Sequence, residues 1–227
     1  MITKLSHLFV AILILSGCAQ TSYRSYDGAS DETRGDRVVK FDRVVKFKVT
    51  KAFFRAAPDC VLVLPTDGVA KAQDKLRIER AAARHLRGKI ERVIGPDERS
   101  RLTRRMALDL TNDADRRYFS KYSYKGRACR FFAIPSIFGI EQNYALIWAG
   151  RRIHLGLKII SGESRDALWK ADHSTDRGDG GLPISLLSLG SATVRASKLN
   201  ADKDILPSMI DDVFRRILVT LPDTRSY

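Results

Sequence analysis

Three adjacent residues, Asp172, His173 and Ser174, are of the types that together carry out acyl transfer and hydrolysis. A catalytic triad needs its carboxylate, imidazole and hydroxyl to converge in space, and adjacency along the chain does not provide that. The sequence contains no GxSxG motif, no Walker loop and no GxGxxG after its first predicted strand. We therefore interpret this segment as the polar end of a hairpin, and a hydrolase is only the second alternative function.

Four arginines, Arg99, Arg101, Arg104 and Arg105, fall within one predicted helix. Guanidinium groups suit carboxylates and phosphates, so this helix is a candidate contact for an anionic ligand. The whole chain is also basic, with 40 Lys and Arg against 26 Asp and Glu and a net charge of +14. Because charge runs usually form solvated surface, a basic surface without a dedicated partner is the alternative.

Two cysteines, Cys60 and Cys129, each stand just before an apolar run that ends in proline, Val61–Pro65 and Phe131–Pro135. If these runs are neighbouring parallel strands, the two sulfurs lie near the same edge of the sheet. We predict a disulfide between them, and two buried free thiols are the alternative. Because neither CxxC nor HExxH spacing occurs, we expect no metal and no cofactor.

The first 17 residues have the layout of a secretory signal, with Lys4, an apolar run from Leu8 to Leu15, and small residues before Cys18. The run is too short to span a bilayer. Leu15-Ser16-Gly17-Cys18 resembles the lipobox of bacterial lipoproteins. The resemblance implies cleavage before Cys18 and its acylation; an ordinary signal with an incidental cysteine is the alternative. Since Ala19 rather than aspartate follows, the resemblance favours the outer membrane, with the domain facing the periplasm.

The segment after Cys18 reads as a tether, because residues 19–35 are polar and have no apolar period. A hexapeptide, Asp36–Phe41, is then repeated as Asp42–Phe47, and the second copy can form an edge strand with basic side chains outward. We divide the chain into a signal peptide (1–17), a flexible tether with the duplicated segment (18–50), an α/β domain (51–222) and a tail (223–227).

Apolar periodicity predicts one α/β domain. The expected strands are 61–64, 90–94, 131–138, 152–160 and 167–171, and the expected helices are 69–88, 97–110 and 205–221. Residues 175–181 are predicted as a Gly-rich loop, and residues 182–194 as a helix or a flap. The predicted fold is a mixed sheet of about five strands with helices packed on it, in β-α-β-α-β-β-β-α order.

Three stretches carry a resemblance to a known group of proteins: Val61–Pro65, Val93–Leu102 and Ser161–Ala171. In this order they resemble envelope lipoproteins related to the curli-secretion lipoprotein and to outer-membrane activators of penicillin-binding proteins, above all the smaller members. The resemblance covers about residues 58–222. The only long alternating segment, Arg152–Ile160, is better explained as sheet core, so we do not expect a pore.

We predict a non-enzymatic envelope lipoprotein that acts through protein–protein contacts in outer-membrane or cell-wall assembly or secretion. Its expected partners are the membrane, through the lipid anchor, and an envelope protein or a second copy of the chain. Nucleic acid is not expected, because an exported chain meets lipids and envelope polyanions instead. The first alternative is a binding module that holds an anionic glycan or lipid through the Arg-rich helix.

Overall fold

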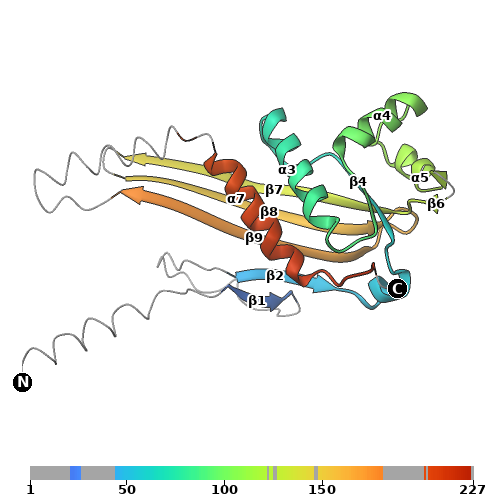
Figure 1. The fold of residues 1–227 in the computed structure, drawn as a ribbon, viewed down its shortest axis with the longest axis horizontal. Coiled ribbons are helices and arrows are strands. Elements are labelled where there is room, and N and C mark those ends of the chain that lie inside the picture. The colour runs from blue at the N-terminus through green and yellow to red at the C-terminus, as the bar shows by residue number, and fades with distance from the viewer. Residues whose placement is uncertain are drawn as a thin grey trace, which may run out of the picture.

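The chain forms a single α/β domain around one mixed sheet, whose strand order is β1-β2-β9-β8-β7-β3-β4 (Figure 1). The computed structural model describes residues 21–26, 44–121, 123–124, 127–145, 148–180, 202 and 204–225. The predicted signal peptide, Cys18, most of the predicted tether and the 182–194 segment lie outside these residues. The strands of the sheet are β1 (Ser22–Ser25), β2 (Val44–Val49), β3 (Cys60–Val63), β4 (Arg92–Ile94), β7 (Phe131–Ala145), β8 (Trp148–Ser161) and β9 (Ala167–Gly180).

The remaining elements are helices and one small hairpin. The helices are α2 (Lys51–Ala56), α3 (Ala72–Leu86), α4 (Pro96–Met106), α5 (Asp113–Lys121), α7 (Ile205–Ile217) and the 3-10 turn η1 (Leu218–Thr220). Strands β5 (Ser123–Tyr124) and β6 (Arg127–Ala128) pair with each other. The series β3-α3-β4-α4-β7-β8-β9-α7 has the predicted element order. In the described part of the chain, no helix is both long and apolar enough to cross a bilayer.

The sheet has seven strands instead of the predicted five or so. The two further strands, β1 and β2, come from the segment predicted as a tether. In β2, Val45 is fully buried while Lys46 and Lys48 are exposed, so the second copy of the repeat alternates as a half-buried strand does. β1 pairs in parallel with β2, and its four exposed residues give no apolar alternation that could have revealed it.

Two boundaries differ from the prediction for identifiable reasons. Residues 175–180 are strand and not loop, because the antiparallel ladder with β8 continues from Thr175, opposite Ile153, to Gly180, opposite Trp148. Helix α4 ends at Met106 and does not continue to Leu110. Its next residue, Ala107, adopts a left-handed conformation with φ of 52°, which ends the helix.

Each face of the sheet carries its own apolar core. Helices α3 and α7 cross one face (Figure 1), and their buried side chains pack on the inward residues of β8, which are Ile153, Leu155, Leu157 and Ile159. The apolar stripe of α7 includes Ile210, Val213, Phe214 and Ile217, at helical spacing. The second core lies under α4 and α5, against residues of β3, β4 and β7 such as Leu62, Ile94 and Phe132.

A disulfide joins Cys60 and Cys129, as predicted, with the two Cα atoms 5.1 Å apart. The condition behind the prediction is met, because β3 and β7 are parallel neighbours with Val61 opposite Phe131. The bond lies in the core under α4 and α5, where both cysteines are buried. It therefore connects the start of β3 to the residues that lead into β7.

A buried ion pair between Glu79 of α3 and Arg99 of α4 fixes the other end of β3. The Arg99 guanidinium donates to Glu79 Oε2 at 2.7 Å and to the Val63 carbonyl at 2.7 Å. Glu79 Oε1 accepts a hydrogen bond from the Thr66 backbone N–H at 2.8 Å. The Glu79–Arg99 pair thus connects α3, α4 and the segment from Val63 to Thr66.

Candidate functional site

One half of the sheet surface has no helix over it among the described elements. Helices α3 and α7 pack on the opposite face, and α4 and α5 cover only the β3, β4 and β7 side of this one. We call the uncovered part over β2, β9 and β8 the open face. Its side chains are the outward-pointing residues of the three strands, which are Lys46, Lys48, Lys170, Asp172, Ser174, Arg152, His154, Gly156 and Lys158.

Three lysines form a row straight across the open face. Lys48 of β2 is directly opposite Lys170 of β9, and Lys170 is directly opposite Lys158 of β8. Like charges at directly opposite positions of a sheet are destabilising, because their Cβ atoms are only about 5 Å apart. The Lys170 ammonium is 4.2 Å from the centre of the Tyr26 ring, a cation–π contact. This lysine row is the strongest concentration of one charge on the open face.

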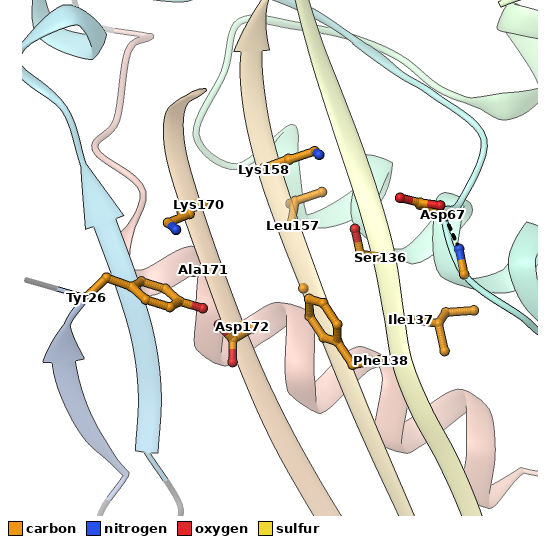
Figure 2. Close-up of a pocket in the computed structure, with 12 residues that line it drawn as sticks. Tyr26, Asp67, Ser136, Ile137, Phe138, Leu157, Lys158, Lys170, Ala171 and Asp172 are labelled. Atoms are coloured by element: carbon orange, nitrogen blue, oxygen red, sulfur yellow. Dashed lines mark hydrogen bonds between the residues drawn. The ribbon is translucent and has the colours of Figure 1, made fainter. Parts of the chain in front are cut away.

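A hollow of about 380 Å³ lies beside the lysine row. Its volume falls in the range of roughly 300 to 1,000 Å³ that is typical of small-molecule sites. Figure 2 views the hollow with α7 behind the strands: Tyr26, Lys170 and Asp172 lie on one side, Lys158 and Phe138 in the middle, and Ser136 and Asp67 on the other. The hollow thus combines cations, carboxylates, a hydroxyl and two aromatic rings.

Two glycines keep the hollow open. Gly68, which follows β3, has a φ of +101°, and a Cβ there would lie 2.4 Å from the Ile137 carbonyl oxygen. Only glycine adopts this conformation at such close approach without strain. A Cβ on Gly156, in the floor, would lie 2.8 Å from the Phe138 ring. Gly156 therefore leaves the space in which that ring lies on the sheet.

Phe138 lies on the open face at a β-bulge. It follows Phe132, Ile134 and Ser136 in the alternation of β7, which places all four side chains on the same face. The pairing of β7 with β8 shifts between Ile137, opposite Leu155, and Gly139, opposite His154, so Phe138 is the extra residue. The ring is 61% exposed, and its centre is 4.7 Å from that of the His154 ring. A large apolar ring is thereby presented to solvent next to a polar hollow.

A carboxylate–imidazole pair borders the hollow. His154 Nε2 is 2.9 Å from Asp172 Oδ2, and the Asp172 side chain is 12% exposed. Burial raises the pKa of Asp172 to about 6. Burial, followed by the positive charges of Lys46 and His173, lowers the pKa of His154. The contact between Asp172 and His154 alone would lower the pKa of Asp172 and raise that of His154. Because both pKa values move in the opposite direction, desolvation by burial is the larger effect. At neutral pH the pair is a carboxylate that accepts a hydrogen bond from a neutral imidazole.

The Asp172, His173 and Ser174 side chains do not converge. Because side chains alternate along a strand, Asp172 and Ser174 point to the open face and His173 points to the face under α7. There His173 is buried, and its Nδ1 is 3.1 Å from the Val44 carbonyl oxygen. Among the described residues, neither His154 nor His173 is hydrogen-bonded to a hydroxyl or a thiol. This arrangement lacks the nucleophile–base contact of a triad.

The four arginines predicted as an anion contact do not share one surface. Arg99 is turned inward, with a side chain that is 12% exposed and engaged by Glu79 and Val63. Arg101, Arg104 and Arg105 are exposed on α4, and Arg104 donates to the Ser100 carbonyl of its own helix. The predicted set is therefore divided between a structural ion pair and a solvated helix surface.

The lysine row and the hollow could not be predicted from the sequence. Apolar alternation predicts the polar side of β8 and the basic outward residues of β2, but it does not give the register that aligns Lys48, Lys170 and Lys158. The bulge at Phe138 has no signature in the sequence. Among the described residues, no group of three or more His, Cys, Asp or Glu side chains is placed to hold a metal ion.

Comparison with known proteins gives structural similarity only. No protein-family model and no curated protein matches the sequence. PelC from Paraburkholderia phytofirmans, crystallised as a dodecamer, is 13% identical with a TM-score of 0.45, and the match covers 79% of this chain and 96% of that chain. Lipoprotein GNA1162 from Neisseria meningitidis is 12% identical with a TM-score of 0.40, covering 63% and 96%. The minor lipoprotein from Acinetobacter baumannii is 8% identical with a TM-score of 0.36, covering 70% and 87%. Similarity at this level assigns neither a family nor a function.

The raised pKa of Asp172 predicts a pH-dependent stability difference between the wild type and Asp172→Asn. Because the folded-state pKa is raised, the contribution of Asp172 is fully present below its ordinary value of 3.8 and is lost as the pH rises through about 6. Denaturant unfolding should therefore show Asp172→Asn gaining stability over the wild type between pH 4 and pH 7.5, by at most about 3 kcal/mol. A difference that does not change with pH over this range would contradict the assignment.

Proposed function

We propose that this chain is a non-enzymatic envelope lipoprotein that binds an anionic ligand on the open face of its sheet. The lysine row carries the proposal. Lys48, Lys170 and Lys158 repel one another at directly opposite positions of neighbouring strands. A bound carboxylate or phosphate would offset this repulsion and form charge-assisted hydrogen bonds. The hollow beside the row gives such a ligand a concave site.

The open face is a better anion site than the Arg-rich helix. On α4, Arg99 is engaged internally and the other three arginines are exposed to solvent. On the open face, Lys158 and Lys170 line a hollow together with two aromatic rings. Charges at a concave site act together on one ligand, whereas dispersed surface charges interact separately with solvent and salt.

We further propose that the chain is anchored through Cys18 in the outer membrane, with its domain in the periplasm. The lipobox-like sequence and Ala19 support this proposal, and so does the Cys60–Cys129 disulfide, since disulfides persist in oxidising compartments. The element order β3-α3-β4-α4-β7-β8-β9-α7 supports the resemblance to the curli-secretion and penicillin-binding-protein-activator group.

Removing two charges of the lysine row should abolish most anion binding. We expect the double variant Lys158→Ala, Lys170→Ala to bind fluorescent polygalacturonate, and vesicles containing phosphatidylglycerol, about tenfold more weakly or worse, a loss of about 1.4 kcal/mol. Binding by the wild type should weaken as salt rises, because it depends on charge. The polygalacturonate measurement uses the full-length protein in non-ionic detergent. The vesicle measurement uses the Cys18→Ser background in detergent-free buffer, because detergent would dissolve the vesicles.

The matched control removes the same charge elsewhere. Arg101→Ala, Arg105→Ala takes two exposed cations from α4 and should leave binding within about twofold of the wild type, because neither side chain lines the hollow. Unfolding measurements on both variants test that the fold is retained. Equal losses in the two variants would mean that net charge, and not the lysine row, governs binding.

The anchor predicts a specific intact mass. The protein extracted from the membrane fraction should have the mass of residues 18–227 plus acyl chains, with two hydrogens fewer before reduction than after it because of the disulfide. Cys18→Ser should lose the acyl mass and leave the membrane fraction. An unacylated wild type would remove the envelope assignment while leaving the anion site to be judged separately.

Self-assembly or contact with an envelope protein is a second candidate function, favoured by two strand edges. Among the described residues, the outer edges of β7 from Phe138 onward and of β9 from Ser174 onward pair with no other strand. Unpaired edges are templates for strand addition. Sedimentation of the full-length protein in detergent should then detect oligomers, and Thr175→Lys on the β9 edge should reduce them. A monomer at all concentrations would exclude self-assembly through these edges.

A further inference from the structure

A second, smaller hollow of about 210 Å³ adjoins the first and shares Lys158 with it. It lies between α5 and the end of the β8–β9 hairpin, above the outward residues Phe132, Ile134 and Ile160. Close packing forms this corner: a Cβ on Gly162 would lie 2.6 Å from the Ser120 Cβ of α5. Because Lys158 lines both hollows, they are neighbours, and we call the two together, on the open face and its border with α5, the strip.

The second hollow is strongly cationic. Besides Lys158, it is lined by Arg116, Arg117 and Arg165, against the single carboxylate of Asp113. Asp113 is 2.9 Å from the Arg165 guanidinium and 3.5 Å from that of Arg116. Arg117 is exposed and makes no ion pair within the described part of the chain. Because Asp113 is the single carboxylate in the lining, the charges of Lys158 and the three arginines still leave the smaller hollow positively charged.

The larger hollow combines cations, carboxylates and aromatic rings in its lining. Lys170 and Asp172 lie side by side along β9 on one side of the hollow, Lys158 lies in the middle, and Asp67 lies on the opposite side, so each carboxylate has an ammonium group within the same hollow (Figure 2). Ser136 lies between these groups, and the exposed Phe138 ring and the Tyr26 ring provide apolar surfaces (Figure 2). A ligand that fits must therefore carry an anionic group, several hydroxyl donors for the carboxylates, and an apolar ring face.

We propose that the strip binds a linear acidic polysaccharide of the uronic-acid type, a refinement that rests on the anion-binding function proposed above. One sugar ring occupies the larger hollow against Phe138, donates hydroxyl hydrogen bonds to Asp67 and Asp172, and directs its carboxylate to Lys158 and Lys170. The chain continues past Lys158, so that a further carboxylate meets Arg117 and Arg165 in the smaller hollow. Guanidinium groups suit this second contact because they bind carboxylates with two parallel hydrogen bonds.

The observed chemistry favours a glycan over other polyanions. Polyphosphate offers neither hydroxyl donors nor an apolar face, so it would place bare negative charge beside Asp67 and Asp172. A lipid bilayer presents an extended surface, which cannot reach into two separate hollows at once. An acidic sugar chain carries carboxylates for the cations and hydroxyl donors for Asp67 and Asp172, at short, regular spacing. Because one chain links the two hollows, binding in one raises the effective concentration of the chain at the other and so raises the overall affinity.

The test is the dependence of affinity on ligand length. Calorimetric titration of the full-length protein in non-ionic detergent with oligogalacturonides of increasing length should show the dissociation constant falling at least about tenfold once the chain fills both hollows, and then levelling. Arg117→Gln, Arg165→Gln should abolish this step while leaving the shortest binding oligomer unaffected. Arg104→Gln, Arg105→Gln on α4 is the matched control with the same loss of charge.

Two further probes separate this inference from the function on which it rests. Phe138→Ala should weaken every oligogalacturonide but leave polyphosphate and phosphatidylglycerol vesicles unchanged, because only the sugar uses the ring. If affinity shows no step with length, or if polyphosphate binds as tightly as galacturonate of equal charge, the glycan inference is overturned while anion binding stands. If Lys158→Ala, Lys170→Ala leaves the binding of all probes unchanged, both proposals fail.

Discussion

The ion pair between Glu79 and Arg99 holds together the part of the molecule on which the candidate site depends. Burying two charges is costly, and it is tolerated here because Glu79 also accepts the Thr66 N–H and Arg99 also donates to the Val63 carbonyl. These contacts set where β3 ends and where α3 and α4 lie relative to it. Asp67 and Gly68 line the larger hollow and directly follow Thr66, whose backbone N–H donates to Glu79. The Glu79–Arg99 pair therefore helps to position this part of the hollow's lining.

The location of the site follows from unequal coverage of the sheet. Helices α3 and α7 bury the inward residues of β2, β9 and β8, whereas α4 and α5 extend only over β3, β4 and β7. From Arg152 to Ile159, β8 therefore alternates apolar residues under α7 with Arg152, His154, Gly156 and Lys158 on the open face. The candidate site thus lies where the seven-stranded sheet extends beyond the helices that cover this face.

Features set by local pattern could be predicted from the sequence, and features set by register could not. The alternation of β8, the apolar stripe of α7 and the Cys60–Cys129 pair each depend on neighbours in sequence or on one assumption about strand order. The lysine row depends on how three strands align, and a shift of one residue would turn Lys170 to the other face. The inward position of Arg99 could not be predicted for the same kind of reason: its partner Glu79 is twenty residues away, on another helix.

The disulfide also has a bearing on how such a chain reaches its compartment. Cys60 and Cys129 are separated by 69 residues, and the loop between them contains α3, β4, α4 and α5. Closing a loop of this length contributes about 4 kcal/mol by the chain-entropy estimate, a large share of the stability of an ordinary domain. In a reducing cytosol the chain lacks that contribution and remains closer to the unfolded state, which is the state that a translocation channel threads. If the chain is exported as proposed, oxidation after translocation would stabilise the folded state on the far side of the membrane and so oppose return of the chain through the channel.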